Sequence, residues 1–137
     1  GWLFDKAQEY EKDYSVCMSV DELLSMNDVF EYGNHTNLLH TRNGRQTALL
    51  IEDKEKVLAD LRECEALINT KKIFAYPFGF YKQENIDWLK ELGILLAFTS
   101  VDGINTKETN PYELHRNACR LRCGINDFIK MLGTGNC

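Results

Sequence analysis

Residues 72–101 read KIFAYPFGFYKQENIDWLKELGILLAFTSV, and this stretch decides the fold class. It opens with a β-type run at 72–79 that ends in Pro-Phe-Gly. We predict a strand there, a helix over about 84–92 with Gly93 as its C-cap, and a second strand at 94–101. The second strand is almost wholly apolar, which is typical of strands buried on both faces of a parallel sheet. Strand, helix and strand in this order predict a βαβ unit, and therefore an α/β fold with right-handed crossovers.

The flanking sequence continues the alternation of helices and strands. Ser19, with Glu22 three residues later, is a capping box that predicts a short helix from Val20 to Met26. The longest predicted helix runs from about Ile51 to Asn69, because apolar residues recur there at helical spacing on one face: Val57, Leu61, Cys64 and Ile68. The other predictions are strands at 29–33 and 114–121, a loop at 41–47 and a helix near 125–132.

Composition limits the function classes. The 137 residues suit one domain, with 44% hydrophobic and 27% charged residues. The net charge of −5 is scattered, and no basic stripe is present, so we expect no nucleic-acid partner. No apolar run approaches the roughly 18 residues of a membrane span. We expect residues 1–17 to form an N-terminal arm or short helix before a domain at 18–137, and the chain to be a piece of a longer protein.

The chain has five cysteines, at positions 17, 64, 119, 123 and 137. No pair of Cys-x-x-Cys knuckles is present, so a zinc ribbon is excluded. Reduced, partly buried thiols are one interpretation. A disulfide that involves Cys119, Cys123 or Cys137 is the other.

The stretch EYGNHTNLLHTRNG at 31–44 holds two of the chain's three histidines, His35 and His40. On a strand they would face opposite sides, and on a helix they would lie about 140° apart. They converge only if the first ends a strand and the second lies on the turn beyond it, which Gly33 and Asn37 permit. Such strand ends are where α/β sheets hold their active sites. The residues alone leave two interpretations open: a metal-binding pair or polar loop residues.

Three segments share one resemblance. FEYGNHTNLLH (30–40) resembles the second motif of the polysaccharide deacetylases (NodB homology, carbohydrate esterase family 4), in which a His-Ser/Thr run is followed by a second His. Residues 74–105 resemble the Tyr-Pro-Tyr-Gly segment, helix and strand of the branch that deacetylates poly-N-acetylglucosamine. NPYELHR (110–116) resembles the run into the last strand, with His115 in place of the usual Pro. The resemblance covers roughly residues 18–132 and implies the C-terminal part of a distorted (β/α) barrel, incomplete in this chain.

The resemblance implies a metal-dependent hydrolase that removes N-acetyl groups from a polysaccharide, at the cell surface or outside the cell. His35 and His40 would bind a divalent metal, with zinc the expected ion, and Thr36 would help to fix the turn between them. One wall of the sugar groove would be formed by Tyr76, Pro77, Phe78 and Gly79. Either aromatic ring of that segment would lie against a sugar or, equally, pack in the core.

Two residues of the run at 110–116 are further candidates. Arg116 matches an Arg that can orient an active-site carboxylate in the family, and a structural salt bridge is the alternative. His115 is a candidate general acid, but the neighbouring pattern does not place the family's late His there.

The family's first motif, Thr-Phe-Asp-Asp-Gly, has no counterpart, because the chain contains no Asp-Asp. The resemblance implies that the catalytic base and the third metal ligand come from that motif, upstream of this chain. We therefore expect the parent protein to be the enzyme, this chain alone to be weakly active or inactive, and exposed strand edges to favour self-association. The alternatives are a non-catalytic glycan-binding or interaction domain, and a plain α/β domain whose motifs are coincidental.

Overall fold

The computed structural model describes residues 18–118 and 124–134, which belong to two compact units that divide after Phe30. In the first unit, helix α2 (Val20–Leu24) begins at the predicted capping box. The Glu22 N–H donates to Ser19 Oγ at 3.2 Å, and the Ser19 N–H donates to the Glu22 carboxylate at 2.7 Å. The expected domain boundary after residue 17 lies at the edge of the described residues and stays a prediction.

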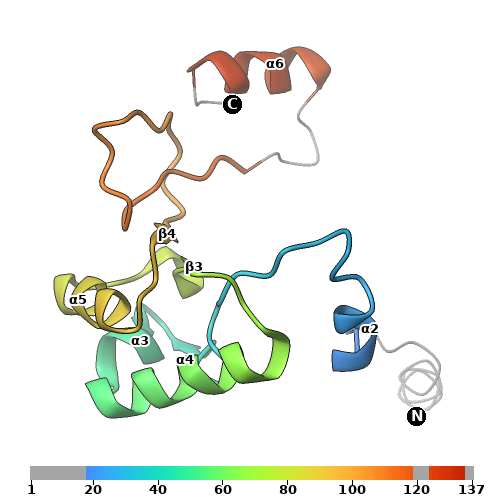
Figure 1. Cartoon of the computed structure of the whole chain (residues 1–137). Helices are drawn as coiled ribbons and strands as arrows, with labels where there is room; N and C mark the ends of the chain where they lie inside the picture. Colours follow the sequence, from blue (N-terminus) through green and yellow to red (C-terminus); the bar gives the residue numbers. More distant parts are fainter. Residues whose placement is uncertain (1–17, 119–123, 135–137) are drawn as a thin grey trace, which may run out of the picture. The chain divides into compact units, whose positions relative to one another are not determined.

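The second unit holds the other elements (Figure 1), which in chain order are β1 (Arg42–Asn43), β2 (Gln46–Thr47), α3 (Ala48–Ile51), α4 (Lys54–Ile68), β3 (Ile73–Ala75), the 3₁₀ turn η1 (Pro77–Gly79), α5 (Gln83–Glu91), β4 (Leu96–Phe98) and α6 (Ile125–Thr134). The βαβ prediction is confirmed in its order and direction: β3 and β4 pair in parallel, with α5 between them in the chain. Gly93 ends α5 in the left-handed conformation, with φ 74°.

The predicted burial of the second strand on both faces is wrong. Ala97 is fully buried, but Leu95 is 64% exposed and Leu96 is 37% exposed. The run is apolar on both faces of the strand, but the core covers only one of these faces within the described residues. Both strands are also shorter than the runs that predicted them, since β3 and β4 have three residues each.

Single β-bridges extend the sheet on both sides. Asn34 pairs in parallel with Phe74, and Leu114 pairs in parallel with Phe98. The predicted strand at 29–33 is wrong, because the N–H groups of residues 29 and 30 both donate to the carbonyl of Met26 in a turn after α2. The predicted strand at 114–121 is reduced to its first residue within the described part, and residues 119–121 lie outside it.

Two further boundaries differ from the sequence prediction. The predicted loop at 41–47 is an antiparallel hairpin of β1 and β2, in which Asn43 pairs with Gln46 across the two-residue loop Gly44-Arg45. Gly44, with φ 61° at the first loop position, is the turn signal that would have found it. The predicted long helix is confirmed as α4, which begins three residues after the predicted start because the Asp53 side chain accepts from the Lys56 N–H at 2.9 Å and caps the helix. The short helix α3 before it was not predicted.

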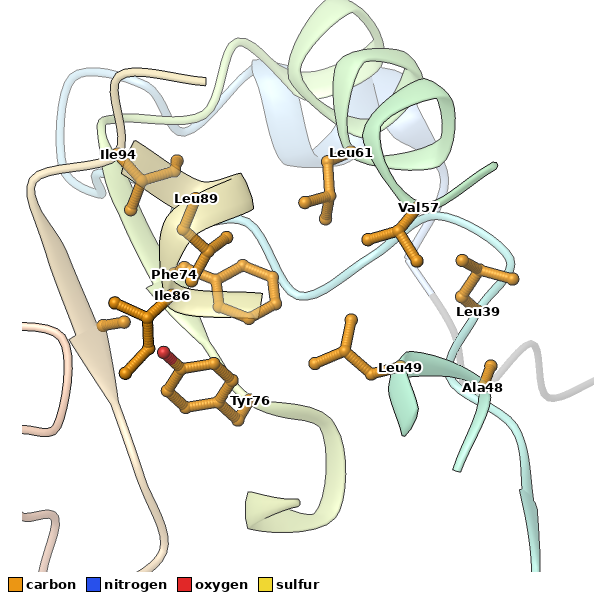
Figure 2. Close-up of a cluster of buried hydrophobic side chains, with 11 residues drawn as sticks. Leu39, Ala48, Leu49, Val57, Leu61, Phe74, Tyr76, Ile86, Leu89 and Ile94 are labelled. Atoms are coloured by element: carbon orange, nitrogen blue, oxygen red, sulfur yellow. The ribbon is translucent and has the colours of Figure 1, made fainter. Parts of the chain in front are cut away.

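The core lies where α3, α4 and α5 meet the β3–β4 pair (Figure 2), and it consists of Leu39, Ala48, Leu49, Val57, Leu61, Phe74, Tyr76, Ile86, Leu89, Ile94 and Ala97. A buried amide ties two of the helices together: Asn85 Nδ2 donates to the Leu49 carbonyl at 3.1 Å. This packing holds the C-terminal ends of the parallel strands in place. Among the described residues, no helix combines the length and the apolar character needed to cross a membrane.

The loop after β4 is closed by two asparagines that each bond a distant backbone group twice. Asn117 accepts from the Gly103 N–H at 2.9 Å and donates to the Gly103 carbonyl at 2.8 Å. Asn105 does the same for His115, at 2.8 and 3.0 Å. The His115 ring lies against Gly103 as a result.

Gly103→Ala should lower the free energy of unfolding by about 1–3 kcal/mol, because the new methyl would meet the His115 ring. An ideal Cβ at this position lies 2.8 Å from His115 Cγ. The measurement is urea unfolding. Gly33→Ala is the matched control, since its Cβ would meet Ile73 Cγ2 at an ordinary 3.4 Å. Equal stability of the two variants would contradict the packing argument.

Candidate metal centre

The backbone at Asn34 positions the first histidine. Asn34 extends the β3 ladder, since its N–H donates to the Ile73 carbonyl at 2.8 Å and its carbonyl accepts from Ala75 at 3.0 Å. Its buried side chain donates to the Leu61 carbonyl at 2.8 Å and accepts from the Thr36 N–H at 2.9 Å. One amide therefore joins the strand edge, helix α4 and the turn that follows.

Thr36 holds that turn in an unusual conformation. Its φ of 73° lies in the left-handed region, which is strongly disfavoured for a β-branched side chain. Its buried Oγ1 has no hydrogen-bond partner among the described residues. Strain of about 1–3 kcal/mol persists only where the surroundings determine the backbone, and such positions gather at functional sites. Thr36 thus holds the turn between the histidines in a strained backbone, and its role at a metal site stays a prediction.

Asp60 of α4 fixes the segment between the two histidines. Its carboxylate accepts from the Asn37 N–H at 2.8 Å and from the Leu38 N–H at 2.7 Å. Asp60 is 7% exposed, and Leu39, the residue after the two N–H donors, is buried in the core. The chain is therefore anchored just before it reaches His40.

These anchors bring His35 and His40 together, with ring centroids 4.9 Å apart and ring planes at 47°. His35 Nδ1 lies 2.7 Å from the Ala75 carbonyl oxygen. Because a carbonyl only accepts, Nδ1 must carry the proton, which leaves the lone pair of Nε2 free for an ion. A backbone carbonyl of this kind commonly orients a metal-ligating histidine.

The pair fits a divalent ion in its chemistry but not in its number of ligands. Imidazole nitrogens are good zinc ligands, and a catalytic zinc site has three protein ligands. Within residues 18–118 and 124–134, no group of three His, Cys, Asp or Glu side chains could hold a metal. The third ligand was expected upstream, so the described residues would supply two ligands of the expected set.

Cys64 lies close to the pair without being a natural ligand. It is a free, buried thiol, and burial raises its pKa, although a hydrogen bond involving the His35 backbone opposes this. Among the described residues, Cys64 and the two histidines do not form a group of three that could hold a metal. The other four cysteines, with their predicted disulfide, lie outside the described residues.

The predicted sugar-groove segment is mostly core. Tyr76 is fully buried, donates its hydroxyl to the Tyr112 carbonyl at 3.0 Å, and stacks on Tyr81 with centroids 4.2 Å apart. Burial raises the pKa of Tyr76 far above its ordinary value and that of Tyr81 to about 12. Pro77 is buried too. Of the four residues, only Phe78 has an exposed side chain, so Tyr76 follows the core-packing alternative that the sequence left open.

Phe78 contacts the second histidine instead of the core. Its ring stacks on His40, with centroids 4.3 Å apart and planes at 26°. The Arg42 guanidinium lies over the rings of Phe78 and Phe80, 5.6 and 5.8 Å from their centroids. Arg42 Nε also donates to the Gly44 carbonyl. The hairpin of β1 and β2 is thus connected to the histidine pair through aromatic rings.

His115 and Arg116 lie on the loop beyond β4. The Nδ1 atom of His115 is buried and has no hydrogen-bond partner among the described groups. The Arg116 N–H donates to the Val101 carbonyl at 3.0 Å, and the Arg116 side chain forms no ion pair with a described carboxylate. Neither the orienting role of Arg116 nor its alternative salt bridge gains support from these contacts.

Sequence reasoning missed Asp60, Arg42 and the contact between Phe78 and His40. A signal for Asp60 was present, because it falls three residues after Val57 and four before Cys64, on the apolar face of its helix. A carboxylate on an apolar face needs buried donors. No comparable signal marks Arg42.

Comparison with known proteins gives a likeness in fold to a solved structure. No family model and no curated protein matches the chain. The solved BpsB deacetylase domain from Bordetella bronchiseptica superposes with a TM-score of 0.63 at 21% identity, over 72% of this chain and 48% of that one. The chain thus has the fold of about half of a deacetylase domain. Identity this low shows the fold alone.

Proposed function

We propose that this chain is part of a metal-dependent deacetylase that removes N-acetyl groups from a polysaccharide, with zinc as the expected ion. The observation that carries the proposal is the convergence of His35 and His40, two residues whose spacing suits no regular element. The deacetylase fold and the resemblance of three ordered motifs support the same reaction class. Polysaccharides of this kind lie outside the cell, so we expect the protein at the cell surface.

In this proposal the main role of the described residues is to hold and orient the two histidines. The Ala75 carbonyl keeps the proton of His35 on Nδ1, so that Nε2 is the ligand atom. Asp60 and Asn34 fix the turn that places His40 beside it. A bound divalent ion would polarise the acetamide carbonyl and lower the pKa of the attacking water. The catalytic base and the third ligand would be the Asp pair expected upstream.

A second candidate is a non-catalytic glycan-binding domain of the same fold. The absence of an Asp-Asp pair from the sequence favours it, since a general base has no evident carrier in this chain. Both candidates share the fold, and the ability to release acetate separates them.

The first test is zinc binding to the chain, measured by calorimetry. His35→Ala and His40→Ala should each weaken zinc binding about 10-fold or more, because each removes one of two ligands. His115→Gln is the matched control, since it changes the third histidine on a different loop, and it should leave zinc affinity unchanged. Unaltered affinity in both alanine variants would contradict the metal site.

The second test concerns the reaction. The chain extended upstream to include an Asp pair should release acetate from an N-acetylglucosamine oligosaccharide when zinc is supplied, and His35→Ala should abolish the release. Binding of the oligosaccharide without acetate release would instead support the glycan-binding candidate.

A further inference from the structure

The two histidines are held in different ways. His35 has the Ala75 carbonyl on its ring nitrogen. His40 is exposed, and no described group forms a hydrogen bond with its ring. A metal-ligating histidine is usually oriented by such a bond, which fixes its ring plane. Something else must orient His40 if it is to bind an ion beside His35.

The face of Phe78 fills that role. The ring planes of His40 and Phe78 differ by 26°, with centroids 4.3 Å apart, so the contact is a face-to-face stack. Arg42 lies over the same aromatic ring. Ring stacking and a cation over a ring face are both attractive contacts, so the three side chains hold one another in place. A flat ring held on another flat ring loses much of its freedom to rotate.

The backbone of Phe78 is strained in the conformation that makes this contact. Its φ is 57° and its ψ is 8°, in the left-handed region that bulky residues rarely adopt. Tyr76 and Pro77 before it are buried, whereas Phe78 is 37% exposed. The left-handed backbone therefore occurs at the residue where the segment's side chains change from buried to exposed. A strained backbone of this kind is often part of a site's preorganisation.

We propose that Phe78 is a positioning residue that orients the imidazole of His40 for metal binding, rather than a platform for a sugar ring. The Phe78 ring, one of the two that the sequence offered as a sugar contact, already contacts His40 and Arg42. The proposal rests on the metal role of His40. It adds that the second ligand is oriented through stacking, where the first is oriented through a hydrogen bond.

The test compares Phe78→Ala and Phe78→Leu with Phe78→Tyr. Leucine keeps apolar bulk without a flat ring, while tyrosine keeps the ring. In the metal-free chain, proton NMR should show the ring-current shift of the His40 imidazole in the wild type and in Phe78→Tyr, and its loss in the other two. With zinc, the alanine and leucine variants should bind about 10-fold more weakly, and the tyrosine variant within about 2-fold of wild type.

The two readouts separate failure of this inference from failure of the proposed function. Unchanged His40 shifts in Phe78→Ala and Phe78→Leu would overturn the stack, and unchanged zinc affinity with lost shifts would overturn its positioning role. If the variants lose oligosaccharide affinity while the His40 shift and the zinc affinity stay unchanged, Phe78 contacts the sugar and the positioning role is overturned. If both His35→Ala and His40→Ala leave zinc binding intact, the metal site itself is wrong. Urea unfolding of each variant confirms that the folded chain is being compared.

Discussion

Asp60→Ala should lower the free energy of unfolding by about 2–3 kcal/mol and weaken zinc binding about 10-fold. The carboxylate accepts from two consecutive backbone N–H groups, of Asn37 and Leu38, and hydrogen bonds to a charged group contribute about 1.5–3 kcal/mol each. Partial exposure of the two donors reduces the loss, because water can replace the carboxylate. The effect on zinc follows since the segment between His35 and His40 would lose its anchor on α4.

Two variants make the Asp60 prediction specific. Glu63→Gln removes a carboxylate one turn further along α4 that accepts from the side chain of the half-buried Asn37 at 3.3 Å. Because glutamine keeps an acceptor oxygen, this variant should change stability by less than about 0.5 kcal/mol. Asp60→Asn keeps the shape but turns an amide NH₂ toward one of the two donors, and it should be nearly as destabilising as alanine. Unfolding in urea and zinc calorimetry provide both values. An Asp60→Ala chain as stable as Glu63→Gln would show that the turn holds without its anchor.

The part of the fold that could be predicted is the part with local signals. The run at 72–79, the helix closed by Gly93 and the run at 94–101 carry their own periodicity and caps, and their order was enough to predict the parallel pair. The outer strands were predicted too long, because each is a single bridge in the structure. A single bridge forms where the adjacent strand lies within reach, and the residue pattern of the segment itself does not show this. The Val29 and Phe30 N–H groups, for example, donate to the Met26 carbonyl in the turn that follows α2.

The site was predictable in its chemistry but not in its contacts. His35 and His40 stand out by residue type, and the need for a turn between them follows from their spacing. What makes the turn is Asp60, more than 20 positions away, and what orients His35 is the Ala75 carbonyl, 40 positions away. The aromatic segment shows the same limit. Nothing local distinguishes Tyr76, which packs in the core, from Phe78, whose left-handed backbone accompanies its exposure.

Gly79→Ala should lower the free energy of unfolding by about 3 kcal/mol or more. Gly79 has a φ of 73°, where an L side chain costs about 1–2 kcal/mol. An ideal Cβ would also lie 1.9 Å from Ser100 Oγ and 2.8 Å from Ser100 Cβ. The hydroxyl can rotate away, but Cβ cannot move without the backbone beyond β4. The strain would reach Phe78, the preceding residue, so the His40 ring shift should change as well.

Gly93→Ala separates the two causes, because Gly93 has a φ of 74° and nothing within 4 Å of its ideal Cβ. It should lose only the conformational part, about 1–2 kcal/mol. Combining Gly79→Ala with Ser100→Gly removes the obstructing side chain. In a double-mutant cycle measured in urea, this should recover the stability that Gly79→Ala loses beyond the loss in Gly93→Ala. If Gly79→Ala is no worse than Gly93→Ala, the β4 end yields to the added methyl. The close fit of Gly79 against Ser100 would then not be what holds Phe78 beside His40.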